Sequence, residues 1–213
     1  MAVVTQERDF TAADSVDSAK RRQIIAGARS VFLSQGFDAG SMGEIARAAG
    51  VSKGTLYVYF KNKEELFEAI VEGQCQQQAE EIFTFDQQAD IEAELRRMGA
   101  ELARFLCRRP GGISPLRTII AIADRMPELG ARFYESGPAR GIAKLSRYLQ
   151  DKIAAGVLAP HDTEVAAAQF IASCKAQIFT PMLFNCAGPP TDEQIAYVVD
   201  IAVRTFLAAY RKT

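Results

Sequence analysis

The segment SMGEIARAAGVSKGTLYVYF, residues 41–60, constrains the fold more than any other part of the chain. Ala46, Gly50 and Leu56 are separated by three and by five residues. This spacing suits a small residue where two helices cross, a glycine in a left-handed turn, and an apolar anchor beneath the second helix. Ser52 stands where it can cap that second helix. The segment therefore predicts two short helices joined by a tight turn.

The first turn of the second helix carries Lys53, Gly54 and Thr55, which are short or can donate hydrogen bonds. In a helix-turn-helix this turn enters the major groove, where close approach needs short side chains and base edges need donors. The pattern predicts that Lys53 or Thr55 contacts base edges or anchors the helix on the DNA. Gly54, which has no side chain, is predicted to let the helix approach the groove closely. We therefore expect a DNA-reading surface here.

The residues that follow suit a passing phosphate backbone. Asn62, with Glu65, is expected to cap the next helix, whose amino end offers further backbone donors. Four side chains are candidates for phosphate contacts: Tyr57, Tyr59, Lys61 and Lys63. The alternative, which the sequence leaves open, is that the tyrosines are half-buried packing residues and the lysines form a solvated face.

Charge is unevenly distributed along the chain. The formal net charge is −1 at pH 7, yet residues 18–63 contain eight basic residues and two acidic ones. Such asymmetry is typical of a small phosphate-facing module attached to a larger body. Lys20, Arg21 and Arg22 are expected in the first turn of a helix, where their sign opposes the helix dipole. Either an external anion or simple solvation would account for them.

Residues 24–70, IIAGARSVFLSQGFDAGSMGEIARAAGVSKGTLYVYFKNKEELFEAI, resemble the amino-terminal module of the TetR family of bacterial transcriptional regulators. The resemblance implies groove contacts from Lys53, Gly54 and Thr55, and phosphate contacts from four residues: Ser41, Tyr57, Tyr59 and Lys63. Val58 departs from the family, in which an aromatic residue is common at this position. Residues 126–150 more weakly resemble the AefR-like subgroup.

No part of the sequence shows a strand pattern, so we expect an all-α protein. Its expected parts are a disordered arm (1–17), a three-helix helix-turn-helix DNA-binding domain (18–63), and a larger helical ligand-binding and dimerisation domain (64–213). Asp17 or Ser18 is expected to cap the first helix, which should end at Gly36. In the larger domain we expect Pro127 to open a short piece and Pro138 to restart the chain.

Two long helices are expected to close the chain. Asp162 can cap the first, which is apolar nearly all round from Val165 to Phe184, and Thr191 with Gln194 can form a capping box for the second. The second carries an apolar stripe: Ile195, Val198, Val199, Ala202, Phe206 and Tyr210. Burial against a partner chain and burial within the chain both fit this pattern. The family resemblance implies a homodimer through a four-helix interface.

Several side chains of the larger domain suit a cavity for an apolar effector, although an ordinary core would use the same residue types. Gln177 and Tyr134 are the polar candidates for orienting such a ligand. The apolar and adaptable candidates are Met98, Leu102, Phe105, Ile119, Met126, Phe133, Phe170 and Cys174.

Other classes of function lack support in the sequence. The four cysteines form no CxxC pair and His161 is the single histidine, so no metal site is expected. We expect no cofactor and no catalysis, because none of the familiar nucleophile, zinc-protease or phosphate-loop motifs occurs. The amino terminus has no secretory pattern, and polar residues interrupt the most apolar region, so we expect a cytoplasmic protein without a membrane span.

Together these features predict a ligand-responsive transcriptional regulator, most simply a homodimeric repressor. It would bind a near-palindromic double-stranded DNA operator and be released by a small apolar or aromatic effector. The alternative is an architectural or cell-cycle DNA-binding protein with the same fold and no effector. A fully packed body would favour the alternative, and an apolar cavity would favour ligand control.

Overall fold

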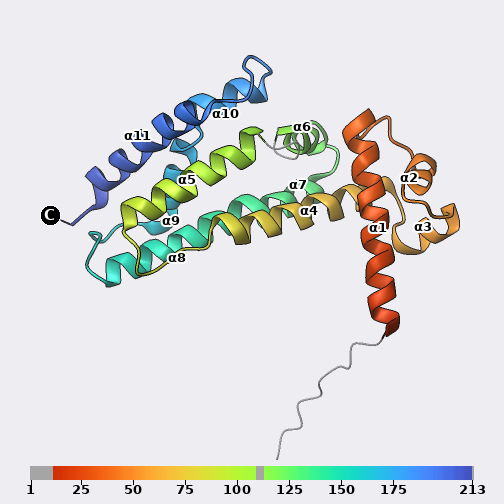
Figure 1. The fold of residues 1–213 in the computed structure, drawn as a ribbon, viewed down its shortest axis with the longest axis horizontal. Helices are drawn as coiled ribbons and strands as arrows, with labels where there is room; N and C mark the ends of the chain where they lie inside the picture. Colours follow the sequence, from red (N-terminus) through yellow and green to blue (C-terminus); the bar gives the residue numbers. More distant parts are fainter. Residues whose placement is uncertain (1–11, 109–112, 213) are drawn as a thin grey trace, which may run out of the picture. The chain divides into compact units, whose positions relative to one another are not determined.

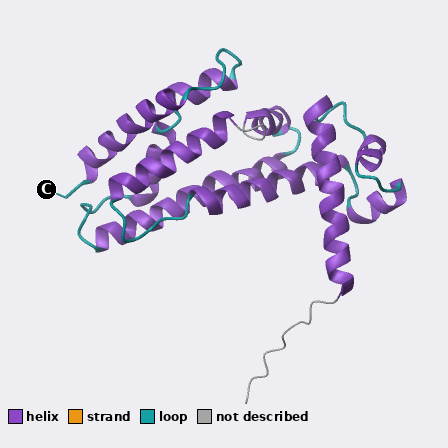
Figure 2. Ribbon diagram, viewed as in Figure 1, coloured by secondary structure: helices purple, strands orange, loops and turns teal. Residues whose placement is uncertain are grey.

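The computed structural model describes residues 12–108 and 113–212. Within these ranges the chain folds into helices joined by loops, and its only extended pairing is an isolated bridge between Leu158 and Arg211 (Figures 1 and 2). The all-α prediction is confirmed. The chain divides into two compact units, an N-terminal unit up to Val71 and a C-terminal unit from Glu72.

The N-terminal unit contains α1 (Ala12–Gln35), α2 (Met42–Ala48), α3 (Lys53–Tyr59) and the first turns of α4 (Lys63–Ile82). Its core is a single cluster that includes Leu66 and Ile70 of α4. The unit therefore extends past Lys63, the expected boundary, because the first turns of α4 are needed to cover the apolar faces of α1 to α3.

Helix α1 begins at Ala12, earlier than the expected cap at Asp17 or Ser18. The segment from residue 12 to residue 17, AADSVD, contains no glycine or proline, and acidic residues suit the start of a helix. The basic residues at positions 20–22 consequently lie beyond the first turn, and the opposing dipole interaction predicted for them does not arise. The rest of the expected arm, residues 1–11, lies outside the described residues.

Helix α1 passes very close to the turn between α2 and α3. A Cβ atom added to Gly27 would lie 2.6 Å from the backbone nitrogen of Ala49 and 2.7 Å from its Cα atom. In the same region, Gln23 Nε2 donates a hydrogen bond to the Ala49 carbonyl at 2.7 Å. The sequence pattern placed the small crossing residue at Ala46, but the closest backbone approach is made by Gly27.

The C-terminal unit contains the rest of α4 and all later helices. In it α8 packs against α9 and α5 packs against α11. Leu95, Met98, Leu145 and Ile195 are completely shielded from solvent in its core. The helices are α5 (Ile91–Arg108), α6 (Ile113–Ile122), α7 (Pro127–Tyr134), η1 (Glu135–Ala139), α8 (Arg140–Ala154), α9 (Thr163–Ser173), α10 (Ala176–Leu183) and α11 (Asp192–Tyr210).

Pro138 lies inside a helix and does not start one, so that prediction was wrong. Helices α7, η1 and α8 follow one another without a break, and Pro138 sits in the π-helical turn η1. A π turn interrupts the regular i to i−4 hydrogen bonding, so it can accommodate a residue that has no N–H to donate.

The single long helix expected after Asp162 is two helices. Asp162 caps α9 as predicted, accepting hydrogen bonds from the backbone N–H groups of Glu164 and Val165. The helix then ends at Ser173, whose hydroxyl donates to the Gln169 carbonyl at 2.8 Å. A serine bonded back to the i−4 carbonyl competes with the backbone ladder and favours a bend, and α10 begins three residues later.

The apolar stripe of α11 faces the core of its own chain. Ile195, Val199 and Phe206 are at most 5% exposed within the single chain. The predicted capping box of Thr191 and Gln194 is present. Burial within the chain was one of the two outcomes that the sequence left open, so the stripe itself is no argument for a partner.

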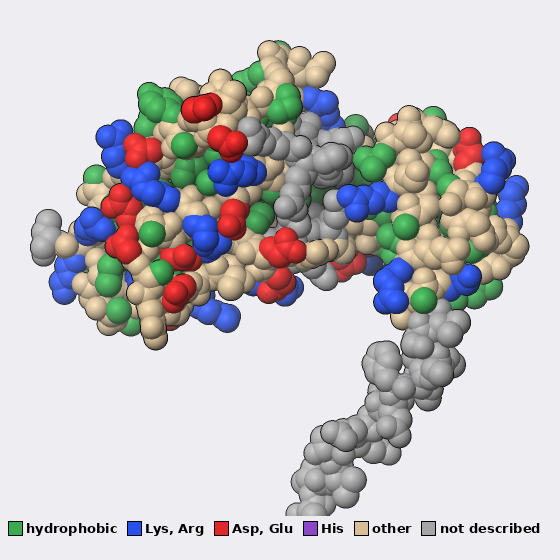
Figure 3. All heavy atoms as spheres, viewed as in Figure 1, with side chains coloured by type: hydrophobic (Ala, Val, Ile, Leu, Met, Phe, Trp, Pro, Cys, Tyr) green, Lys and Arg blue, Asp and Glu red, His purple; other side chains and the backbone are tan. Residues whose placement is uncertain are grey.

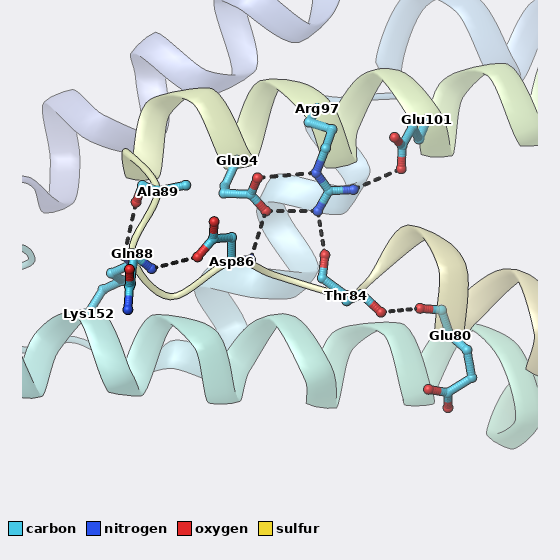
Figure 4. A network of polar contacts seen from close by, with 9 residues as sticks. All are labelled: Glu80, Thr84, Asp86, Gln88, Ala89, Glu94, Arg97, Glu101 and Lys152. Atoms are coloured by element: carbon cyan, nitrogen blue, oxygen red, sulfur yellow. Dashed lines mark hydrogen bonds and ion pairs between the residues drawn. The ribbon is translucent and has the colours of Figure 1, made fainter.

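A polar network fixes the loop between α4 and α5 (Figure 4). Arg97 on α5 donates to both carboxylate oxygens of Glu94, at 3.2 and 2.8 Å, and also to the Thr84 carbonyl. Glu94 in turn accepts the backbone N–H of Asp86 at 3.3 Å. Lys152 on α8 donates to two carbonyl groups of the loop, at 2.9 and 3.3 Å. The C-terminal end of α4 is thereby held against α5 and α8.

Candidate DNA-binding interface and ligand cavity

The first turn of α3 is exposed and built from short side chains. Ser52 caps the helix as predicted, because its Oγ atom accepts the backbone N–H of Thr55 at 3.0 Å. The Ser52 and Thr55 hydroxyl groups are also hydrogen-bonded to each other, at 2.9 Å. Lys53 and Gly54 are exposed. This end of α3 can therefore approach a flat or grooved partner closely.

The turn that orients α3 depends on Gly50. Its φ angle is +64°, a left-handed conformation that side chains other than glycine adopt reluctantly. At Gly54, in contrast, an added Cβ would meet only the Ser52 hydroxyl, at 3.7 Å. The space beyond Gly54 is open, so its lack of a side chain leaves room on the outer surface.

Ser41 belongs to the capping box of α2. Its hydroxyl donates to Glu44 Oε2 at 2.7 Å, its backbone N–H donates to the same oxygen at 3.0 Å, and Glu44 N–H donates to Ser41 Oγ at 3.3 Å. The hydroxyl and backbone hydrogen bonds from Ser41 lower the pKa of Glu44 below its ordinary 4.5. Ser41 is exposed, but its hydroxyl proton is already engaged.

Lys63 is held against the loop that follows α1. Its ammonium donates to the carbonyl oxygens of Phe37 and Asp38, each at 3.0 Å, and lies 4.7 Å from the centre of the Phe37 ring. Two of its three N–H groups are thus engaged within the protein. The third N–H group makes no recorded hydrogen bond to the described residues.

The remaining candidates around α3 differ in exposure. Tyr57 is 52% exposed and Lys61 is exposed, whereas Tyr59 is half-buried and packs against the N-terminal core. Asn62 caps α4 as predicted, accepting the Glu65 N–H at 2.8 Å. Val58, the departure from the family pattern, is 81% exposed. The packing alternative therefore fits Tyr59 better than Tyr57.

Surface charge follows the asymmetry of the sequence. On the face drawn in Figure 3, acidic side chains gather mainly on the C-terminal unit, whereas Lys and Arg side chains lie on both units. In the N-terminal unit, Arg21 stacks over the Phe60 ring at 5.2 Å from its centre. The N-terminal unit thus presents a surface that favours a polyanion.

The C-terminal unit contains an apolar cavity of about 120 Å³. Three predicted residues line it: Leu102, Phe105 and Phe133. Lining residues that the sequence did not single out include Ile82, Phe83, Leu106, Gly141, Ile171 and Lys175. The sequence could not identify them, because an apolar residue in a helix carries no local signal that separates a cavity wall from a packed core.

The other predicted pocket residues do not line this cavity. Met98, Phe170 and Cys174 are buried in the packed core, and burial raises the pKa of the Cys174 thiol to about 12. The two polar candidates, Tyr134 and Gln177, are exposed. The last two candidates also lie away from the cavity: Ile119 is buried and Met126 is half-buried.

Lys175 is the charged residue among the described lining of the cavity. Its ammonium lies 5.5 Å from the centre of the Phe179 ring, and burial lowers its pKa from the ordinary 10.5. The sequence could have pointed to Lys175 as a candidate for the site, because this lysine interrupts the apolar stretch from Val165 to Phe184.

Protein-family models match both parts of the chain. The model described as "Bacterial regulatory proteins, tetR family" matches residues 24–70. The model described as "AefR-like transcriptional repressor, C-terminal domain" matches residues 93–212. The two matches agree with the resemblances seen in the sequence.

Solved structures of other proteins resemble almost the whole chain, and two of them illustrate the likeness. A TetR-family transcriptional regulator from Mesorhizobium loti is 31% identical, with a TM-score of 0.85, over 92% of this chain and 98% of that one. The flavonoid-responsive regulator FrrA is 32% identical, with a TM-score of 0.78, over 91% and 98%. The regulator AcrR of Shigella flexneri is 46% identical over 52 residues, which make up only 24% of this chain and 24% of AcrR.

The helix-turn-helix of the first unit and the helical second unit define a DNA-binding transcriptional regulator. The chain belongs to the TetR family, with a C-terminal domain of the AefR-like type. Members of the family are generally repressors, and the family and its similar structures are transcriptional regulators, not enzymes. Across the residues that the structure describes, no helix is both long and apolar enough to cross a bilayer.

Proposed function

We propose that the protein is a homodimeric repressor that binds a near-palindromic operator and is released by a small effector. The N-terminal unit would bind DNA, and the C-terminal unit would bind the effector and dimerise. The observation that carries the proposal is the exposed first turn of α3, with Lys53 and Gly54 open to solvent.

In this proposal Lys53, Gly54 and Thr55 enter the major groove, and the phosphate backbone passes over the residues that flank α3. Tyr57 and Lys61 suit phosphate contacts because they are exposed. The other three phosphate candidates are less available. Ser41 must give up its hydrogen bond to Glu44 before its hydroxyl can donate to a phosphate. Lys63 has one N–H group left to donate, and Tyr59 is half-buried.

Exposed apolar side chains of the last three helices support a homodimer. Tyr197 and Ile201, one turn apart on α11, are 65% and 39% exposed. Val165 on α9 is 49% exposed, and Phe184, just after α10, is 73% exposed. Large apolar side chains that are exposed in the single chain suit burial against a partner, and a two-fold dimer would match a near-palindromic operator.

The cavity supports control by a ligand over the architectural alternative. Ala79 and Ile82, at the end of α4, line the cavity, while Leu66 and Ile70, near its start, belong to the core of the N-terminal unit. A ligand that displaces the end of α4 would thus act on the helix that also builds the DNA-binding unit. A coupling of about 1–3 kcal/mol would lower operator affinity by roughly 5- to 150-fold. The relative FrrA is described as flavonoid-responsive, which fits an organic effector.

The test is to recover and sequence the fragments of sheared genomic DNA that the purified protein binds at near-physiological salt. The proposal expects one enriched near-palindromic motif. Lys53→Gln should weaken enrichment of that motif, and the matched control Lys212→Gln, an exposed lysine of the C-terminal unit, should not. Binding without a shared motif would favour the architectural protein instead.

A further inference from the structure

The cavity of the C-terminal unit combines an apolar wall with one cation. Leu102, Phe105 and Phe133 contribute apolar surface, and Lys175 lies among them at the start of α10. In the described part of the chain no carboxylate pairs with Lys175, and its ring neighbour is Phe179. An ammonium in such surroundings has lost part of its hydration without gaining a counter-ion.

This arrangement differs from that of the other partly covered lysines of the unit. Lys144 pairs with Glu80, and Lys152 donates to two backbone carbonyl groups. Both therefore have partners that compensate for burial within the protein. Among the described residues, the contact recorded for the Lys175 ammonium is the Phe179 ring, and burial lowers the pKa of Lys175 because it disfavours the charged form.

The size of the cavity limits the ligand. At about 120 Å³ it is smaller than the pockets that enclose drug-sized ligands, which measure about 300–1,000 Å³. An engineered apolar cavity of about 150 Å³ binds benzene, so this one suits a single aromatic ring or a short alkyl chain.

We propose that the cavity binds a small organic acid, with one aromatic ring or a short alkyl chain in the apolar part and its carboxylate paired with the Lys175 ammonium. This inference rests on the proposed effector role of the cavity and adds the chemical class of the effector. The carboxylate supplies a counter-ion that none of the described residues provides at Lys175, and the ring or chain fills the space between α5, α7 and α8.

The charge of the ligand should affect its binding affinity more than small differences in its shape do. A neutral amide of the same shape retains the apolar contacts but offers no anion to the ammonium. Hydrogen bonds between charged groups are stronger than hydrogen bonds between neutral groups. We therefore expect the acid to bind about 10- to 100-fold more tightly than its amide.

The test compares benzoate with benzamide by isothermal titration calorimetry on the full-length protein without DNA. The proposal expects the acid to be preferred by the wild type, the preference to vanish in Lys175→Met, and Lys175→Arg to retain it. Lys212→Met, which removes an exposed lysine far along the chain from α10, should behave as wild type.

A second variant tests whether the probe enters the cavity. A Cβ added to Gly141 would lie 2.8 Å from Cζ of Phe83, so Gly141→Ala should drive that ring into the cavity and weaken both probes alike. Equal affinity of wild type for acid and amide, no binding of either, or an acid preference that survives Lys175→Met would overturn the proposal. The comparison of acid and amide affinities in the wild type tests the proposal even if a variant folds poorly.

Release of operator DNA is measured separately, so that the two proposals fail in different ways. If the acid binds through Lys175 without releasing DNA, the inference about the ligand stands and the proposed effector control is wrong. If the amide binds as tightly as the acid and both release DNA, effector control stands and the role of Lys175 is wrong.

Discussion

Gly27 and Gly73 both lie inside helices, α1 and α4, but in opposite surroundings. A Cβ at Gly27 would collide with the backbone of Ala49, whereas a Cβ at Gly73 would meet no atom within 4 Å. We expect Gly27→Ala to destabilise the N-terminal unit by about 1–3 kcal/mol through overpacking. Gly73→Ala, the matched control, should stabilise α4 by about 0.5–1 kcal/mol. Urea unfolding followed by circular dichroism checks both, and equal stabilities would contradict the close approach.

Variants of Lys61 and Lys63 can separate a proposed DNA contact from a contact that stabilises the fold. Lys61 is exposed, so Lys61→Ala should leave stability unchanged and reduce the magnitude of the salt slope of operator binding by about 0.9 per lost contact, or about 1.8 for a dimer. Lys63→Ala should in addition lower stability by about 1–2 kcal/mol, because it releases the Phe37 and Asp38 carbonyl groups. An unchanged salt slope in Lys61→Ala would remove Lys61 from the interface.

At the scale of elements, the short helices could be predicted because their signals are local. Ser52 and Asn62 cap α3 and α4, and the positive φ of Gly50 makes the turn, so neighbouring residues alone define these boundaries. The helix continues through Pro138 because of a π turn, and α9 ends at Ser173, whose hydroxyl bonds to a preceding carbonyl. The residue pattern does not distinguish either case from an ordinary helix end. The cavity could be predicted least, since packing between distant helices decides whether a residue such as Phe105 or Phe170 faces it.

Glu94 anchors the loop between α4 and α5. Glu94 is 8% exposed and binds Arg97 and the Asp86 N–H, so Glu94→Gln should destabilise the C-terminal unit by about 1–3 kcal/mol. Glu101→Gln is the matched control, because Glu101 pairs with the same guanidinium at a side-chain exposure of 40%. Surface pairs contribute about 0–1 kcal/mol, so this variant should differ little from wild type.

The effect of Glu94→Gln should depend on pH with a defined sign. The hydrogen bond from Arg97 lowers the pKa of Glu94 below its ordinary 4.5 in the folded state. The ionised carboxylate therefore stabilises the fold fully above the unfolded-state pKa, and this contribution is lost as pH falls through the lower folded-state pKa. Thermal unfolding should show the gap between wild type and variant narrowing below pH 4.5. A gap that widens in acid would contradict the role assigned to the ion pair.

In the proposed homodimer, the C-terminal units would join two recognition helices, which must reach successive major grooves about 34–36 Å apart. The buried stripe of α11 already covers the core of its own chain, so a partner that packs on α11 must meet the opposite, exposed face that carries Tyr197 and Ile201. We expect Ile201→Glu to convert the proposed dimer to a monomer, since a carboxylate buried in an apolar interface loses its hydration. Ile120→Glu, at an exposed isoleucine of α6, is the matched control and should remain dimeric.

Sedimentation equilibrium gives the mass of each variant, and operator titration gives its affinity. If Ile201→Glu is monomeric and binds the full operator weakly while binding a half-site like wild type, the dimer contributes affinity by joining two intact readers. If it remains dimeric, the interface lies elsewhere on the C-terminal unit. A monomer that binds the full operator as tightly as wild type would mean that two-fold symmetry has no part in recognition.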